Sequence, residues 1–441
     1  MPCLLPGKSR GGKMTDRVFV IGRKNPDTDG IASVIGYAHL KNKITGEDRY
    51  VPVTAGLLEV RTMKILDFLL IKYPPLMEDL NLHVSDIMAK RVIVAPLGTP
   101  IVEVFKIMVK EDIRVVPVVD NENRFFGLVG FIDIAKKSIS TVVPDVFRRV
   151  KTSIELMSRS VSGDVVNSVD GGEEFIANIM VVATSAERFC SDIDTFDARG
   201  VVAVVGDRED VQRVAIEKRV RCLVICDGYE LSEELLELAR KNEVSVIYSP
   251  YGACTTVGLI EWSTPVYTIA NKGESVARQG ERVNDIRERM LTSPNRALPV
   301  IDEKTGKVLG IITRTDLAKH VARRVILIDH SDTLNAPEGI FSCVVEEIID
   351  HHRFGDIRLK EAARIRTEPW GSTSAIVADE YMKHNLKPER KIALLLAAGI
   401  MINTEFFEKA TTTEKDKEMF EWLMDISGED KESFISRIKN L

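Results

Sequence analysis

Two distant segments of the chain repeat one pattern, and this repeat constrains the fold more than any other feature. Residues 114–133 read RVVPVVDNENRFFGLVGFID, and residues 296–316 read RALPVIDEKTGKVLGIITRTD. Each copy follows a helical pattern and runs from an arginine through an apolar strand with a proline, a polar turn and a second strand to a final aspartate. Repetition of a whole supersecondary unit at such a separation predicts two copies of one small α/β module rather than a solenoid.

The end of each copy carries residues that could hold a ligand. Thr313 and Asp316 lie three residues apart at a predicted strand-to-helix turn. There a hydroxyl can bind a phosphate, an aspartate can bind a ribose hydroxyl, and the helix N-terminus offers free N–H groups. The first copy has Gly130 and Asp133 at these positions and therefore lacks the hydroxyl. The alternative is that both motifs only form turns, with the aspartate as an N-cap.

A further α/β unit is predicted between the repeats, at about residues 160–260. Strand patterns alternate with helix patterns along this segment, in the order ANIMVVAT, VVAVVGDRED, VQRVAIEKRV, RCLVICDG, SEELLELARKNE and VSVIYSP. This alternation is typical of a parallel sheet.

Outside the repeats, three apolar strands each end in acidic residues: VFVIGRKNPDTD, VILIDHSD and VVEEIIDHHRFGD. Ligands of open parallel sheets bind at the carboxyl ends of the strands, so these clusters should converge. Carboxylate and imidazole groups are ligands for Mn²⁺ and similar ions. Two such ions about 3.5–4 Å apart can generate a hydroxide for phosphoryl transfer. Helix capping is the alternative for each acid, but acids behind three strands disfavour capping alone.

Composition and charge exclude several classes of protein. The 441 residues suffice for about two to four domains. The net charge of −6 gives no basic footprint for nucleic acid. No apolar run approaches the ~18–20 residues that span a bilayer, so no membrane partner is expected. The six cysteines show neither metal-site nor disulfide spacing, which predicts a reduced, cytoplasmic protein.

Several motifs together resemble known families. The repeats resemble the cystathionine β-synthase (CBS) domain, which works in pairs and commonly binds adenine nucleotides, and GDREDVQRVAIE and YGACTTVGLI resemble the DRTGG domain. The segments NPDTDGI, LIDHSD, IIDHHRFGDI, EPWGSTSAIVADEY and FFEKATTTEKD resemble the DHH superfamily, most closely the nucleotide-regulated family II, manganese-dependent inorganic pyrophosphatases. The implied fold class is α/β, with a parallel-sheet DHH domain split by an inserted CBS–DRTGG–CBS regulatory region.

The resemblance also implies boundaries, ligands and site residues. The expected parts are a tail (1–16), the first DHH part (17–78), CBS repeat 1 (79–140), a DRTGG-like domain (155–262), CBS repeat 2 (263–321) and the second DHH part (322–441). The expected metal ligands are Asp27, Asp29, Asp329 and His351; the catalytic residues are His352 and Asp350; the nucleotide-binding residues are Thr313, Asp316 and Asp133. The implied cofactors are Mn²⁺, or Co²⁺ or Mg²⁺, and a regulatory adenine nucleotide (AMP, ADP, ATP or a diadenosine polyphosphate). Pyrophosphate is the implied substrate, and a homodimer the implied assembly.

The chain departs from the family pattern in three places. Arg23 stands where the family has a ligating histidine, and a guanidinium has no lone pair to offer a cation. Asn403 stands where the family has an aspartate and brings no negative charge. The third expectation is the absence of the family's C-terminal domain, which supplies arginine and lysine to pyrophosphate, because the sequence given ends at Leu441.

Three functions remain open at the level of sequence. The first is a catalytically impaired relative, a pseudoenzyme that binds adenine nucleotides and regulates. The second is an active metal-dependent pyrophosphatase or phosphoester hydrolase with an altered metal site. The third is an interaction module that binds neither nucleotide nor metal. Arg23 could also serve as a fixed cation for a phosphate or an acidic ligand.

Overall fold

The computed structural model describes residues 17–140, 148–273, 275–319 and 322–441, so the predicted tail (1–16) lies outside the described residues. The chain forms two compact units. Unit 1 comprises Met88–Glu281 and Ile286–Asp316, and unit 2 comprises residues 17–87, Arg282–Asp285 and Leu317–Leu441. Unit 2 is therefore built from segments on both sides of unit 1, which confirms the predicted split domain.

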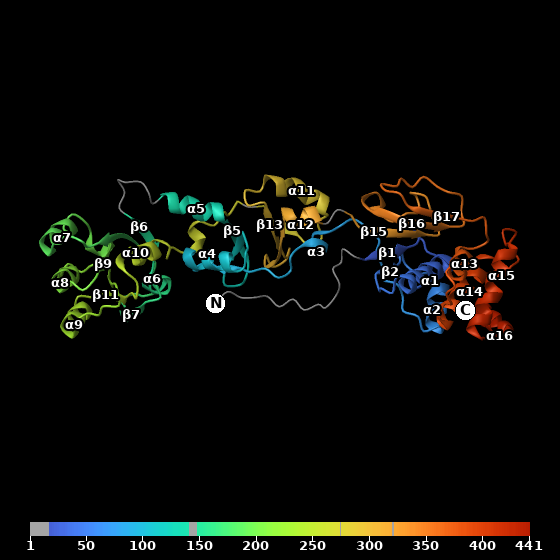
Figure 1. Ribbon diagram of the computed structural model, residues 1–441, viewed down its shortest axis with the longest axis horizontal. Helices are drawn as coiled ribbons and strands as arrows, with labels where there is room; N and C mark the ends of the chain where they lie inside the picture. Colours follow the sequence, from blue (N-terminus) through green and yellow to red (C-terminus); the bar gives the residue numbers. More distant parts are fainter. Residues whose placement is uncertain (1–16, 141–147, 274, 320–321) are drawn as a thin grey trace. The chain divides into compact units, whose positions relative to one another are not determined.

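A five-stranded parallel sheet forms the centre of unit 2, in the order β17–β16–β15–β1–β2 (Figure 1). Its strands are β1 (Val18–Ile21), β2 (Tyr50–Val53), β15 (Arg324–Ile328), β16 (Val344–Asp350) and β17 (Arg364–Thr367). The strand β1 pairs with β2 on one side and with β15 on the other. The two distant parts of the chain thus share one sheet, and the ends of β1, β15 and β16 lie next to one another.

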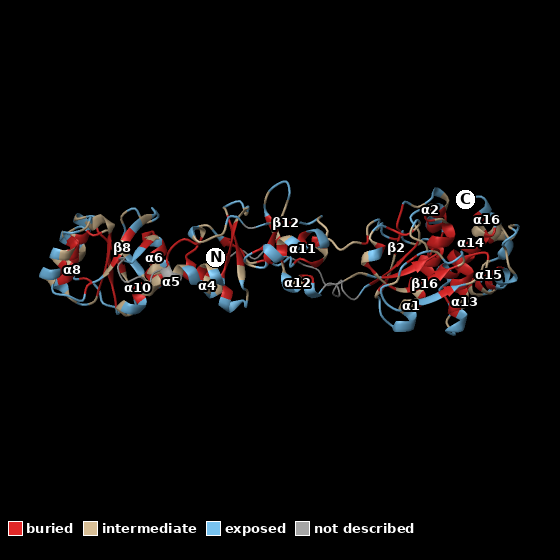
Figure 2. Cartoon of the chain, turned by 90° about the horizontal axis from the view of Figure 1, so that it is seen from above, coloured by how far each residue is buried: buried red, intermediate tan, exposed pale blue. Residues whose placement is uncertain are grey.

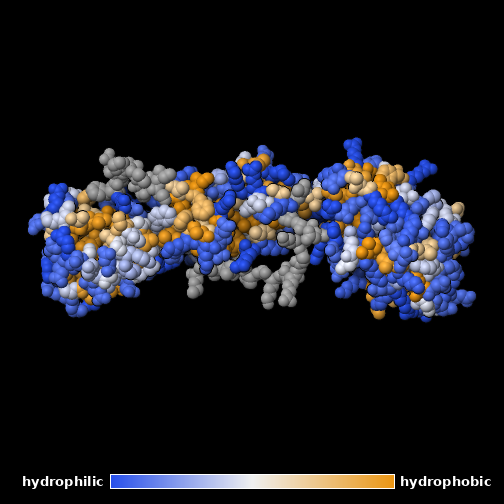
Figure 3. All heavy atoms as spheres, viewed as in Figure 1, coloured by the Kyte–Doolittle hydropathy of each residue, from blue (hydrophilic) through white to orange (hydrophobic). Residues whose placement is uncertain are grey.

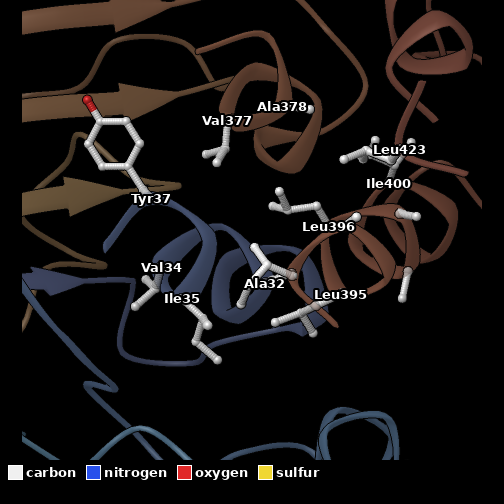
Figure 4. Close-up of a cluster of buried hydrophobic side chains, with 14 of the residues drawn as sticks. Ala32, Val34, Ile35, Tyr37, Val377, Ala378, Leu395, Leu396, Ile400 and Leu423 are labelled. Atoms are coloured by element: carbon white, nitrogen blue, oxygen red, sulfur yellow. The ribbon is translucent and has the colours of Figure 1, made fainter. Parts of the chain in front are cut away.

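The helices of unit 2 are α1 (Thr28–Thr45), α2 (Val60–Phe68), the short α3 (Val84–Ile87), α13 (Thr373–Lys383), α14 (Arg390–Asn403), α15 (Glu414–Ser427) and α16 (Lys431–Lys439). Figure 4 shows α1 against α13 and α14, with Val377 and Leu396 in the core. A Cβ at Gly36 would lie 2.8 Å from Leu396 Cδ2, so a larger residue here would displace the Leu396 side chain between α1 and α14. Figure 2 shows the buried residues along these helices and β16.

The segment of the sequence between the two repeats forms a six-stranded sheet in the order β6–β8–β9–β10–β11–β7. Its strands are β6 (Arg149–Thr152), β7 (Asp164–Asn167), β8 (Phe175–Val181), β9 (Val201–Val205), β10 (Cys222–Ile225) and β11 (Ser245–Tyr248). Its helices are α6 (Ile154–Val161), α7 (Ala186–Ile193), α8 (Glu209–Glu217), α9 (Glu233–Lys241) and α10 (Ala253–Glu261). The four inner strands are parallel as predicted, but β6 and β7 pair antiparallel at the edges. These edge strands, RVKT and DVVN, are too polar to show a strand pattern in the sequence.

The two repeats fold alike. Repeat 1 consists of β3 (Ala95–Pro96), α4 (Ile101–Lys110), β4 (Val115–Val119), β5 (Phe125–Gly130) and α5 (Phe131–Ser140). Repeat 2 consists of β12 (Ala277–Arg278), α11 (Val283–Thr292), β13 (Ala297–Ile301), β14 (Val308–Thr313) and α12 (Arg314–Lys319). Gly130 pairs with Val115 as Thr313 pairs with Ala297, so Gly130 and Thr313 occupy equivalent places. Within the described residues, no helix combines the length and apolar character needed to cross a membrane.

Candidate metal centre and nucleotide clefts

The loop after β1 places a cation among acidic groups. Asp27 caps α1, where its Oδ1 accepts a hydrogen bond from Gly30 N at 2.8 Å. Its Oδ2 accepts one from Arg23 Nη2 at 2.7 Å. Arg23 Nε donates to the carbonyl oxygen of Asn25 at 3.0 Å and lies 4.0 Å from Asp329 Oδ2. The guanidinium is thus fixed by the loop and lies between two predicted metal ligands.

Asp29 reaches across to the start of another helix. Its carboxylate accepts hydrogen bonds from the backbone nitrogens of Thr373, at 2.8 Å, and Ser374, at 2.9 Å, in the first turn of α13. Burial raises the pKa of Asp29, and a positive charge on His351 would oppose this rise. A helix N-terminus favours an ionised carboxylate, and each oxygen keeps a further lone pair for a cation.

Asp329 lies at the centre of the cluster. It follows β15 with φ at 65°, a left-handed conformation that aspartate tolerates better than most residues. Its side chain is buried, and its Oδ1 accepts a hydrogen bond from Thr373 Oγ1 at 2.7 Å. Burial raises the pKa of Asp329 well above 3.8, and the charges of Asp29 and Asp27 raise it further. A nearby positive charge would favour the ionised forms of Asp29 and Asp329, as the hydrogen bonds from Ser374 and Thr373 already do.

His351 presents a lone pair to Asp329. Its Nδ1 lies 3.1 Å from the carbonyl oxygen of Trp370, which can only accept, so Nδ1 carries the proton and Nε2 the lone pair. The distance from Nε2 to Asp329 Oδ1 is 3.5 Å. Nε2 also lies 3.4 Å from Asn403 Nδ2, which donates to the carbonyl oxygen of Gly371 at 2.8 Å. The amide nitrogen of Asn403, rather than its oxygen, therefore faces the imidazole.

His352 is held by a buried carboxylate. Asp350 accepts hydrogen bonds from His352 Nδ1 at 2.8 Å and from Ser331 Oγ at 2.9 Å. Burial opposes ionisation of Asp350, but these hydrogen bonds outweigh it and lower the pKa of Asp350. The same bond to Asp350 raises the pKa of His352. Because its Nδ1 is engaged, His352 keeps Nε2 for a substrate or an ion.

These residues fit one metal ion better than two. Asp329, His351 and His352 each offer a ligand atom, and these atoms lie within 4.8 Å of one another. One carboxylate and two imidazoles suit Mn²⁺ or Co²⁺. On the other side of Asp329, the guanidinium of Arg23 lies between Asp329 and Asp27. The predicted ligands thus share one edge of the sheet, but Asp27 is paired with a protein cation.

Sequence reasoning assigned no role to Ser331, Thr373 and Ser374, which hold the acidic side chains in place. The sequence features that could have identified them are weak. Ser331 follows Asp329 by two residues, and Ser372 begins the Ser-Thr-Ser run that caps α13. His330 is buried beside Asp329 with its Nδ1 on the carbonyl oxygen of Ile328.

The predicted nucleotide residues lie in unit 1. Thr313 donates from its backbone nitrogen, at 2.8 Å, and from its Oγ1, at 2.6 Å, to Asp316 Oδ2. In repeat 1, Gly130 N donates to Asp133 Oδ2 at 2.8 Å, and Asn295 Nδ2 lies 3.5 Å from the same oxygen. These hydrogen bonds are the ones expected if each motif only forms a turn with the aspartate as its N-cap. They also hold each aspartate at the end of its strand.

Comparison with known proteins matches both parts of the chain. The CBS domain model matches residues 84–140 and 268–323, and the DRTGG domain model matches residues 157–263. A probable manganese-dependent inorganic pyrophosphatase of Thermotoga maritima is 32% identical over 426 residues, which are 97% of this chain and 77% of that protein. A cobalt-dependent inorganic pyrophosphatase of Clostridium perfringens is 32% identical over 96% of this chain and 76% of that protein.

Among solved structures, the CBS and DRTGG domains of the regulatory region of Clostridium perfringens pyrophosphatase, complexed with the activator diadenosine tetraphosphate, match with a TM-score of 0.47. The match has 26% identity and covers 53% of this chain and all of that one.

Proposed function

Because this chain belongs to the family of manganese-dependent inorganic pyrophosphatases and carries CBS and DRTGG domains, we propose that it is an adenine-nucleotide-binding regulatory protein whose own pyrophosphatase activity is impaired. The proposal assigns nucleotide binding to the CBS repeats of unit 1. It assigns a weakened metal and pyrophosphate site to unit 2.

The position of Arg23 carries this proposal. Its ion pair with Asp27 and its approach to Asp329 put a permanent positive charge where a metal ligand is needed. Asn403 adds to the impairment because its amide nitrogen faces His351 Nε2 and contributes no negative charge. A bound ion would polarise phosphate oxygens and activate water. We assign Asp29, Asp329 and His351 to holding it, with Asp27 only if Arg23 moves away.

The other catalytic groups are retained. The hydrogen bond from His352 to Asp350 fixes the ring and keeps the pKa of His352 above its ordinary value, as a residue that donates a proton to a phosphate requires. The expected loss of activity therefore comes from weak metal binding and not from the loss of a proton donor.

For the nucleotide, the strand end at Thr313 and Asp316 supports repeat 2 as the main site. Thr313 Oγ1 can release Asp316 and turn to a phosphate, and Asp316 can then accept from a ribose hydroxyl. Asp133 is assigned the same ribose contact in repeat 1. The ligand class is an adenine nucleotide: AMP, ADP, ATP or a diadenosine polyphosphate.

Phosphate release from pyrophosphate tests the catalytic half of the proposal. The full chain would be stripped of metal and assayed with added Mn²⁺, Co²⁺ or Mg²⁺, with a metal analysis of untreated protein in parallel. We expect no metal-dependent turnover in the ~1–10³ s⁻¹ range of ordinary enzymes. Turnover in that range with any of these ions would overturn the impairment.

Calorimetric titration tests the nucleotide half. AMP, ADP, ATP and diadenosine tetraphosphate would be titrated into the parent, Thr313→Ala and Asp316→Asn. Both variants should bind at least ~10-fold more weakly, because each loses a hydrogen bond to a charged or polar ligand group. Thr292→Ala, an exposed threonine at the end of α11, is the matched control and should bind like the parent. Unchanged binding by Thr313→Ala and Asp316→Asn would favour a module that does not bind nucleotide at this strand end.

A second candidate, an active metal-dependent hydrolase of pyrophosphate or another phosphoester, is favoured by one observation. Asp329, His351 and His352 still converge on one possible ion position. The pyrophosphatase assay separates the two candidates directly, because the second requires metal-dependent turnover.

A further inference from the structure

The two oxygens of Asp329 face different partners. Oδ1 lies 3.5 Å from His351 Nε2 and 3.9 Å from His352 Nδ1, while Oδ2 lies 4.0 Å from Arg23 Nε. A carboxylate can bridge two metal ions with one ion on each oxygen. Here the imidazoles are on one side of the carboxylate, and a guanidinium is on the other.

Arg23 is also fixed where it lies. Its Nε donates to the carbonyl oxygen of Asn25 at 3.0 Å and its Nη2 to Asp27 Oδ2 at 2.7 Å, so the loop that would surround an ion is closed around the arginine. The Oδ1 of Asp27 is used by the N-terminus of α1. For Asp27 to ligate an ion, the Arg23 ion pair would have to break, and the free guanidinium would then repel that ion.

On the imidazole side, by contrast, the Nε2 atom of His351 is open to an ion. His351 Nε2 bears a lone pair because its Nδ1 donates to the carbonyl oxygen of Trp370. Asp329 Oδ1 lies 3.5 Å from His351 Nε2, and the amide nitrogen of Asn403 lies 3.4 Å from it, in a contact that an ion can displace. Asn403 Nδ2 keeps its stronger hydrogen bond to Gly371 when this contact is lost.

We propose that unit 2 holds a mononuclear metal centre, in which one divalent transition-metal ion binds at Asp329 and His351, beside the ring of His352, and the guanidinium of Arg23 occupies the place of a second cation. This inference rests on the proposed function for the identity of the ion. It explains how the acidic cluster of Asp27, Asp29 and Asp329 can be retained without two ions. The site keeps part of its positive charge as a protein side chain that no chelator removes.

Mn²⁺ stoichiometry tests the proposal. Equilibrium dialysis of the full chain against Mn²⁺ should give one ion per chain, and the ion should show the electron paramagnetic resonance spectrum of isolated Mn²⁺. The double variant Arg23→His, Asn403→Asp should bind two ions per chain, with the spectrum of a spin-coupled pair. Two ions in the parent, or no gain in the double variant, would overturn the proposal.

Two further variants locate the ion and guard against a misfolded double variant. His351→Ala should lose the single ion, whereas His384→Ala, an exposed histidine of the same unit, should keep it. An ion that survives His351→Ala would place the site elsewhere and contradict the proposal. Far-ultraviolet circular dichroism of each variant establishes that it is folded. The number of bound ions is measured independently of turnover. A chain that binds one ion and hydrolyses pyrophosphate at ordinary rates would agree with the mononuclear centre and contradict the proposal of impaired activity.

Discussion

Gly130 and Thr313 occupy equivalent places in the two repeats, but their surroundings differ. Asn295 of repeat 2 reaches the strand end of repeat 1, and a Cβ at Gly130 would lie 2.1 Å from Asn295 Oδ1. The space that a hydroxyl side chain would fill is therefore taken by an amide, which also approaches Asp133. This difference makes repeat 1 the weaker of the two candidate nucleotide sites.

The difference predicts how a second site could be opened. Combining Gly130→Thr with Asn295→Ala should restore the hydroxyl and free Asp133, so titration with AMP should change from one nucleotide per chain to two. Asn295→Ala alone is the control for simple removal of the amide and should leave the stoichiometry at one. A parent that already binds two nucleotides with equal affinity would show that Asn295 does not block repeat 1.

At the scale of elements, β17 and α13 are joined by a charged network. Arg364 donates to both carboxylate oxygens of Glu380, at 2.7 and 2.9 Å, and Arg366 pairs with Glu380 and Asp379. Glu380 is buried. Burial opposes its ionisation, but the two arginines outweigh this effect and lower the pKa of Glu380 below its ordinary value of 4.5. The stabilisation is therefore present above pH 4.5 and is lost as the pH falls through the lowered pKa of the folded state.

Replacement of Glu380 by glutamine tests this network. Removal of one partner from a buried ion pair costs about 3 kcal/mol, so the free energy of unfolding of unit 2 at pH 7 should fall by roughly this amount. The gap between the parent and Glu380→Gln should shrink as the pH falls below 4.5 and through the lowered pKa of the folded state, because Glu380 is then protonated first in the unfolded chain and finally in the folded one. Glu418→Gln, from an exposed pair with Lys415, is the control and should change stability by less than about 0.5 kcal/mol in urea titrations. An equal cost at pH 7 and pH 3.5 would contradict the electrostatic account.

The loop before α13 depends on a second helix. Asp416, in the first turn of α15, accepts hydrogen bonds from Gly371 N at 2.8 Å, Ser372 Oγ at 3.0 Å and Thr413 N at 2.9 Å. Gly371 in turn accepts from Asn403. The capping box of α15 therefore fixes the backbone that lies next to His351.

Loss of the Asp416 carboxylate should consequently affect both stability and the site. Asp416→Ala leaves several donors without a partner and should lower the free energy of unfolding by about 2–3 kcal/mol. Amide hydrogen exchange of residues 371–373 should accelerate in the folded protein. The matched control is Asp430→Ala, an exposed N-cap of α16 with one capping bond, for which a loss of about 1 kcal/mol and unchanged exchange at 371–373 are expected. Unchanged exchange in Asp416→Ala would mean that the loop is held by other contacts.

The sequence predicted the strands and helices better than it predicted the contacts between side chains. Apolar runs such as VFVI and VILI identified the parallel strands of unit 2, and the rule for strand ends placed Asp29, Asp329 and His351 on one edge. Neither the pairing of Arg23 with Asp27 nor the approach of Asn295 to Gly130 could be predicted, because each depends on side-chain geometry set by tertiary packing. The edge strands RVKT and DVVN were missed because their pairing depends on the neighbouring sheet and not on an apolar pattern.

At the scale of the whole molecule, unit 1 exposes large apolar side chains on α4 and α5. Figure 3 shows hydrophobic residues at the surface over the part that carries α4 and α5. Val109 of α4 and Ile132 of α5 are 61% and 58% exposed. Exposed apolar patches commonly mark interfaces, so these side chains are the surface on which the homodimer implied by the family resemblance can be tested.

Ile132→Asp tests this surface. A buried carboxylate without a partner should shift the chain from dimer to monomer at micromolar concentration in sedimentation velocity. Ile44→Asp, at an exposed apolar position of α1 in unit 2, should leave the sedimentation coefficient unchanged. A parent that sediments as a monomer would exclude this assembly.

The division into two units, each with its own buried core, predicts that nucleotide and metal stabilise different parts of the chain. A ligand at 100 times its Kd adds about 2.7 kcal/mol to the unit that binds it, or roughly 5–10 °C in Tm for a unit of this size. AMP should raise the temperature of the unfolding transition of unit 1, and Mn²⁺ should raise that of unit 2.

Trp262 lies in unit 1, whereas Trp370 and Trp422 lie in unit 2, so fluorescence of the Trp262→Phe variant reports on unit 2 alone. In that variant Mn²⁺ should raise the fluorescence transition, whereas AMP should leave it in place; an equal response to AMP would show that the two units unfold as one.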